Sequence, residues 1–128
     1  MERTLNDSSL IQATIYFRYY VHQALKVAGM GDHLLDNLQI WRDQMALGLT
    51  TWAEMPEPTR SDCHAWGASP NIEFFRILLG IDSNAPGFKS IRIAPSLGDL
   101  KEVSGTMPHP VGSVTASYKL CLLYTSDA

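Results

Sequence analysis

Cysteine is scarce in this sequence, and it has neither a strongly basic segment nor a long apolar one. Its 128 residues include two cysteines, Cys63 and Cys121, too few for a disulfide framework or a cysteine zinc site. The formal net charge of −3 argues against a dedicated nucleic-acid-binding domain, which would carry a basic excess. No apolar run reaches the roughly 18 residues of a membrane span, and the opening MERTLNDSSL lacks the apolar core of a signal peptide. We therefore expect neither nucleic acid nor membrane as a partner, and the compartment stays open between cytoplasm and periplasm.

A packed core is expected, because 45% of the residues are hydrophobic and 18% are charged. The length suits one domain or part of a larger one. Apolar residues recur at three- and four-residue spacing over 10–28, which predicts a helix with Ser8 or Ser9 as its N-cap. Gly29 should end this helix, because glycine tolerates left-handed backbone angles.

A second helix is predicted directly after the first, with Asp32 as its cap and Gly48 as its end. A short glycine turn between two such helices is typical of an antiparallel helical hairpin. The helical spacing predicts a buried stripe made of Leu34, Leu38, Trp41 and Met45.

Helical spacing returns after Arg60 and should end at Gly80. Pro70 lies inside this stretch, so it either kinks one helix that starts near Ser61 or begins a new helix capped by Ser69. We favour the single kinked helix. One side of it would be lined by Ile72, Phe74, Phe75, Leu78 and Leu79.

From Ile81 onward the pattern favours strands. After a turn-rich linker, DSNAPG, three strand candidates follow, FKSIRIAP, LKEVSGTM and VGSVTASYKL. In the last, Val114, Ala116 and Tyr118 alternate with polar residues. The chain is therefore predicted to be α+β, with an incomplete antiparallel β part, because three short strands make a small sheet.

The final eight residues, CLLYTSDA, are the peptide that the end sequence of a transposase-based sequencing adapter encodes. We therefore expect 121–128 to be an artefact of sequence assembly. The alternative is a genuine apolar strand.

The segment TTWAEMPEPTRSDCHAWGASP gathers most residues able to do chemistry. Glu54 lies beside an aromatic residue, and such a carboxylate can activate water as a general base. Trp52 and Trp66 offer flat faces on which sugar rings stack. The competing interpretation makes Glu54 a solvated loop residue and both tryptophans part of the core.

Three further polar residues in this segment, Arg60, Asp62 and His64, can hydrogen-bond to hydroxyl groups. Asp62 could instead cap the following helix. Cys63 beside His64 is not a predicted nucleophile, because sequence neighbours on a helix point apart, and we expect it to be buried. No histidine spacing suggests a metal site.

Four stretches together resemble the C-terminal end of bacterial α-L-rhamnosidases of glycoside hydrolase family 78. These are ATIYFRYYVHQAL, GLTTWAEMPEPTRSDCHAWGASPNIEF, LLGIDSNAPGFKSIRIAPSLGDL and VSGTMPHPVGSV, and the resemblance runs from about 5 to 120. It implies that 1–80 are the last helices of an (α/α)6 catalytic barrel. It also implies that 81–120 begin a C-terminal β-sandwich domain.

The resemblance implies hydrolysis of terminal α-L-rhamnosyl linkages in glycosides or polysaccharides, with inversion and without a metal or organic cofactor. The end of TTWAE places the general-base role on Glu54, and the histidine of SDCHAW places sugar contact on His64. Trp52 and Trp66 would be pocket walls. Arg60 and Asp62 would bind sugar or hold the loop. The general acid would lie upstream, so the chain alone is expected to be inactive.

Two other functions remain open from the sequence. The first is a non-catalytic carbohydrate-binding module that uses Trp52 and Trp66 as stacking platforms. The second is a helical fragment that pairs through its apolar stripe once the rest of a barrel is missing, with aggregation as the consequence. Replacing Glu54 separates catalysis from binding.

Overall fold

A computed structural model describes residues 2–5, 7–56 and 58–121. The α-helices are α1 (Glu2–Leu5), α2 (Ile15–Val27), α3 (Gln39–Ala46) and α4 (Pro70–Glu73). Shorter helical turns are η1 (Gly31–His33), η2 (Leu35–Leu38), η3 (Ala65–Ala68), η5 (Pro86–Phe88) and the π-helix η4 (Phe74–Leu78). The strands are β1 (Ile81–Ser83), β2 (Ile91–Ile93), β3 (Glu102–His109) and β4 (Gly112–Lys119). The predicted α+β class is confirmed as a small mixed domain with two antiparallel sheets.

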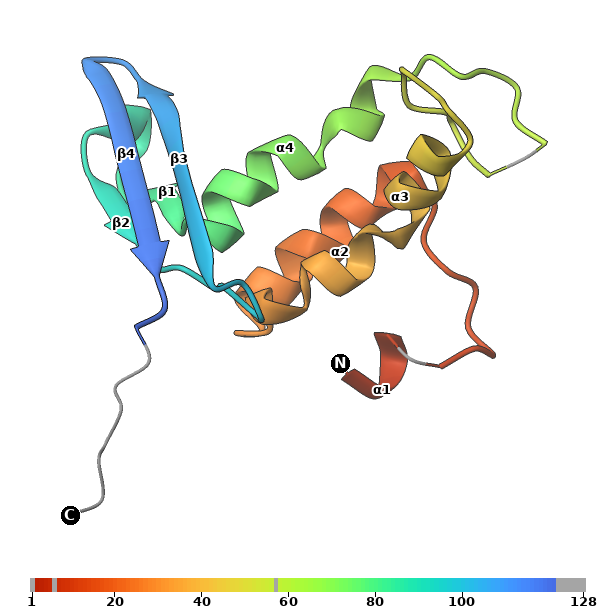
Figure 1. Cartoon of the computed structure of the whole chain (residues 1–128), viewed down its shortest axis with the longest axis horizontal. Coiled ribbons are helices and arrows are strands. Elements are labelled where there is room, and N and C mark those ends of the chain that lie inside the picture. The colour runs from red at the N-terminus through yellow and green to blue at the C-terminus, as the bar shows by residue number, and fades with distance from the viewer. Residues whose placement is uncertain (1, 6, 57, 122–128) are drawn as a thin grey trace.

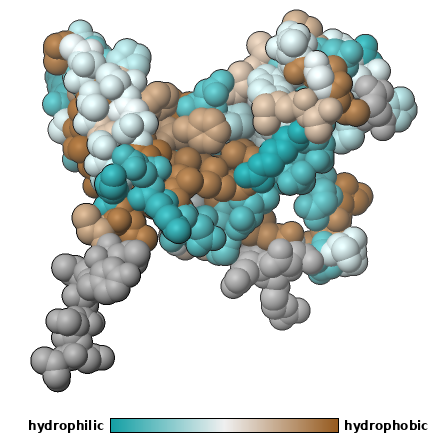
Figure 2. All heavy atoms as spheres, viewed as in Figure 1, coloured by the Kyte–Doolittle hydropathy of each residue, from teal (hydrophilic) through white to brown (hydrophobic). Residues whose placement is uncertain are grey.

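The helices α2, α3 and α4 lie alongside one another, α1 lies apart from them, and the strands gather at one end of the three helices (Figure 1). The loop over 47–64 lies at the opposite end. Figure 2 shows hydrophobic residues concentrated at the centre of the molecule, between the strands and the helices. The loop that holds Glu54 is therefore anchored by helices and lies away from the sheets.

The first predicted helix is confirmed, but it begins five residues later than expected. Residues 10–14 are not helical, and Thr14 occupies the N-cap position of α2. Ser9 is not the cap, because its backbone N–H and its hydroxyl both donate to Asp7 in a local turn that competes with helix formation. The helix ends as predicted, with Gly29 at φ 69°.

The second predicted helix is broken into η1, η2 and α3. Leu34, Leu38 and Trp41 are buried as predicted, whereas Met45 is 57% exposed. Asp32 caps no helix, because its carboxylate accepts the backbone N–H of Gly98 at 2.8 Å. The chain itself covers most of the predicted stripe, so pairing through an exposed stripe is wrong for those three residues.

The single kinked helix that starts near Ser61 is wrong, and the alternative start at Pro70 is confirmed, although the Ser69 side chain forms no cap hydrogen bond. Pro70 is the first residue of α4, with Ser69 at the N-cap position. Residues 61–64 are not helical, because they pair with the preceding part of the loop. The π-helix η4 also shifts the apolar face. Ile77 is buried beside Leu78 and Leu79, whereas Ile72 and Phe74 are exposed.

The strand candidates are confirmed in part. β3 and β4 form an antiparallel hairpin, and the three residues of the predicted alternation, Val114, Ala116 and Tyr118, lie on the core side of β4. β1, which pairs with β2, was not predicted, because it has three residues, two of them inside the turn-rich stretch, and these are too few to show an alternating pattern. Both hairpins pack on the end of η4 through Leu79 and Ile81.

Of the final eight residues, the structure describes Cys121 alone, so the expected artefact at 121–128 otherwise lies outside the described residues.

Over 2–5, 7–56 and 58–121, no helix is long and apolar enough to span a membrane.

Candidate active site

The loop that carries Glu54 folds back on itself through backbone hydrogen bonds. Glu54 N–H donates to the carbonyl of Ser61 at 3.0 Å, and His64 N–H donates to the carbonyl of Trp52 at 2.8 Å. The Thr51 hydroxyl also donates to the backbone carbonyl of Asp62. These bonds explain why 61–64 do not form a helix.

Two buried contacts fasten this loop to the helices. Gln44 of α3 accepts the backbone N–H of Ala53 at 3.0 Å, directly before Glu54. Trp41 donates its indole N–H to the carbonyl of Gly67 at 2.7 Å. Gly67 lies so close to Trp52 that an added Cβ would be 2.3 Å from the Trp52 Cβ. The loop therefore rests on α3 and η3, which limits the drift that a catalytic group must avoid.

The Glu54 carboxylate is bound by Arg60. The Arg60 Nε donates to Oε2 at 2.8 Å, and a terminal guanidinium nitrogen binds Oε1. The Glu54 side chain is 14% exposed and that of Arg60 is 79% exposed. The hydrogen bonds and charge of Arg60, with a smaller contribution from His64, lower the pKa of Glu54 below its ordinary value. Glu54 is therefore ionised at neutral pH, as a general base must be.

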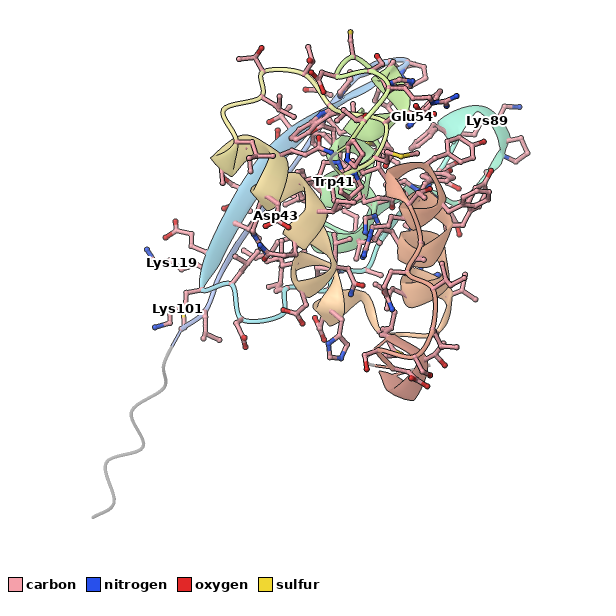
Figure 3. All side chains as sticks on the ribbon, turned by 90° about the vertical axis from the view of Figure 1, so that its right-hand side faces the viewer. Trp41, Asp43, Glu54, Lys89, Lys101 and Lys119 are labelled. Atoms are coloured by element: carbon pink, nitrogen blue, oxygen red, sulfur yellow. The ribbon has the colours of Figure 1, made fainter. Side chains whose placement is uncertain are left out.

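Glu54 forms part of the wall of a hollow of about 480 Å³. Figure 3 shows Glu54 on the loop, away from Lys101 and Lys119 at the far end of the β3–β4 hairpin. The described residues that line the hollow come from α2 and its N-cap, the loop and η3, and are Thr14, Tyr16, Phe17, Glu54, Met55 and Trp66. An ionised carboxylate thus borders a space walled largely by aromatic rings.

Trp66 and His64 lie together at this site. Their ring centroids are 4.3 Å apart, and the Trp66 ring meets Tyr16 edge-on at 5.6 Å. Trp66 is 43% exposed, so its ring can contact a ligand. His64 is half-buried beside it and does not itself line the hollow among the described residues.

The remaining predicted site residues lie elsewhere. Trp52 borders a separate hollow of about 300 Å³ and packs against the cluster of Ile15, Leu38 and Trp41. Asp62 is exposed, and it caps no helix, because η3 begins after His64. Cys63 is exposed, so its predicted burial is wrong.

From the sequence, Tyr16 and Phe17 either pack on a helix or line a cavity with one face, and the structure favours the second, because they are 45% and 57% exposed and line the hollow. The sequence feature that distinguishes these two residues is their position on the helix, away from its buried side. Ile15, His22 and Leu25 form its buried side, and aromatic residues away from that side must face solvent or a ligand.

Over the described ranges, no three His, Cys, Asp or Glu side chains come together as a metal site requires. No family model matches the chain, and no curated protein matches it.

Proposed function

We propose that this chain is the C-terminal part of an inverting α-L-rhamnosidase, with Glu54 as its general base. The observation that carries the proposal is the ionised Glu54 carboxylate on the wall of a hollow lined by Tyr16, Phe17 and Trp66. Aromatic faces suit the apolar side of a sugar ring, and a carboxylate at the edge suits a bound water.

An inverting glycosidase uses two carboxyl groups roughly 6.5–9.5 Å apart, so that a water fits between the base and the anomeric carbon. Glu54 would take a proton from this water as its oxygen attacks the anomeric carbon. The second group would protonate the departing glycosidic oxygen. Among the described residues that line the hollow, Glu54 is the one carboxylate, so the acid must come from elsewhere. The chain alone is therefore proposed to be inactive.

Within this proposal, α2, α3 and α4 are the last helices of an (α/α)6 barrel, and β1 to β4 begin a β-sandwich domain. Trp66 and Tyr16 form the sugar-facing wall, and His64 sets the position of the Trp66 ring or reaches the sugar beside it. Trp52 and Asp62 hold the loop.

The test uses a longer protein, called the joined protein below, in which this chain follows the segment encoded upstream of it in its natural gene. Its activity is measured as release of a chromogenic aglycone from an aryl α-L-rhamnoside. Glu54→Gln should reduce kcat by on the order of 10²- to 10⁴-fold and retain sugar binding, because general-base catalysis contributes that much. Glu102→Gln, in an exposed carboxylate of β3, is the matched control and should leave kcat unchanged. A joined protein that cleaves another glycoside and ignores rhamnosides would contradict the assignment.

The carbohydrate-binding module has less support. It needs Trp52 and Trp66 as one platform, whereas the two rings border different hollows. Unchanged turnover in Glu54→Gln would favour it.

A further inference from the structure

The exposed Arg60 side chain binds Glu54, which lines the hollow. Both carboxylate oxygens of Glu54 are held by the Arg60 guanidinium. Among the described residues Arg60 is not part of the wall of the hollow, although its partner is. A molecule in the hollow could therefore contact Glu54 while Arg60 stays in place.

We propose that Arg60 is a positioning residue that holds the Glu54 carboxylate ionised and oriented toward the hollow, and that it does not bind the sugar. The inference rests on the proposed function of Glu54. It replaces the sugar-contact role that the sequence suggested for Arg60.

The acceptor capacity of a carboxylate leaves room for this role. An ionised carboxylate has about four acceptor sites on its two oxygens, and the forked guanidinium occupies one on each. One site per oxygen remains for a water in the hollow. A planar fork also fixes the plane of the carboxylate, which a lysine ammonium cannot do, because it acts as a point charge.

The surroundings of Arg60 and Glu54 fit a fixed arrangement. The Thr59 hydroxyl donates to the carbonyl of Ser61 at 3.1 Å, which pins the chain on both sides of Arg60. Over the part of the chain that the structure describes, Arg60 and, more weakly, His64 act on Glu54, and both lower its pKa. Among the described residues that line the hollow, Tyr16 is the other titratable group.

The test needs no enzyme activity, so it is done on this chain. Carbon-13 labelling of glutamate carboxyl groups lets the Glu54 resonance be followed against pH by NMR, and Glu54→Gln assigns that resonance. The pKa of Glu54 should lie below the ordinary value of about 4.3 in the natural chain and return close to it in Arg60→Gln. Arg60→Lys should recover part of the shift. Arg92→Gln, in an exposed arginine of β2, should change nothing.

Identical Glu54 titrations in the natural chain and in Arg60→Gln would overturn the inference. Full recovery by Arg60→Lys would overturn the requirement for a fork.

In the joined protein, Arg60→Gln should shift the acidic limb of the kcat/KM profile to higher pH, because the limb follows the pKa of the free base, with KM for the sugar little changed. A large rise in KM without a shift of the limb would make Arg60 a sugar contact instead. A shifted titration in this chain, combined with no rhamnoside hydrolysis by the joined protein, would refute the proposed function and leave the Arg60–Glu54 relationship standing.

Discussion

The side-chain carbonyl of Gln44 accepts the backbone N–H of Ala53 at 3.0 Å, and both residues are buried. This bond ties α3 to the residue directly before Glu54. Replacing Gln44 with Met keeps the volume but leaves a buried N–H without an acceptor. We expect a loss of about 1–3 kcal/mol in the free energy of unfolding, measured by urea denaturation.

Gln39→Met is the matched control for Gln44, because Gln39 is an exposed residue of the same helix. It should change the free energy of unfolding by less than about 0.5 kcal/mol. A Gln44→Met protein as stable as the control would show that the bond to Ala53 does not hold the loop.

The sequence predicted the helices well where spacing alone decides, and poorly where distant parts of the chain compete. The glycine after α2 fixed the end of that helix, because a left-handed residue is a local signal. Asp32 has the chemistry of a helix cap, yet it binds Gly98, 66 residues away. Such a partner cannot be found from local propensity.

The same limit applied to the candidate site. Glu54 was selected as a candidate because its residue type and its neighbours suggest catalysis, and this role stays a prediction. Tyr16 and Phe17 form a wall of the hollow because α2 packs beside a loop nearly 40 residues further along the chain. A local sequence pattern cannot predict such a long-range contact. Trp52 and Trp66 looked equivalent in sequence, and only packing separates them.

His22 should make the fold less stable in acid. Its ring is fully buried in α2, and a backbone group of Asn37, which favours the charged form, only partly offsets this burial. Burial, with a smaller contribution from the charge of Arg18, lowers the pKa of His22 to about 4. The unfolded chain binds this proton below about pH 6.5, whereas the folded chain does not bind it until about pH 4. Stability is therefore lost as pH falls through this window, by about 3 kcal/mol between pH 7 and pH 4.

The measurement is urea denaturation from pH 4 to pH 7 of the natural chain and of His22→Leu. Glu73 acts in the opposite direction, because burial raises its pKa and acid then favours the folded state. The difference between the two proteins isolates His22, because Glu73 is present in both. His33→Asn changes a partly exposed histidine and should keep the acid sensitivity. Equal pH dependence in His22→Leu and the natural chain would contradict the assignment.

Gly80 should be irreplaceable at the junction of η4 and β1. It has φ 68°, and an added Cβ would lie 2.1 Å from the carbonyl carbon of Ala94. Gly29 is the matched control, because its φ is 69° and an added Cβ would meet nothing within 4 Å. Gly29→Ala should cost about 1–2 kcal/mol from backbone strain alone. Gly80→Ala should cost at least about 3 kcal/mol, measured by thermal and urea unfolding, because strain and clash add. Equal costs would show that the Gly80 backbone moves aside.

Trp52 and Trp66 should separate a packing role from a binding role. Trp52 packs against Trp41, so Trp52→Ala should lower the free energy of unfolding by roughly 3 kcal/mol. Trp66 is 43% exposed and contacts the rings of His64 and Tyr16, so Trp66→Ala should cost about 1 kcal/mol.

For catalysis by the joined protein, Trp66 should matter more than Trp52, because Trp66 borders the Glu54 hollow and Trp52 does not. Loss of one aromatic contact with the sugar, worth about 1 kcal/mol, should lower kcat/KM of Trp66→Ala by roughly five- to tenfold. Trp52→Phe keeps the packing and should leave kcat/KM near the natural value. If Trp52→Phe lowered kcat/KM more than Trp66→Ala, the sugar would occupy the hollow that Trp52 borders, which Glu54 does not line, and Glu54 could not activate the attacking water.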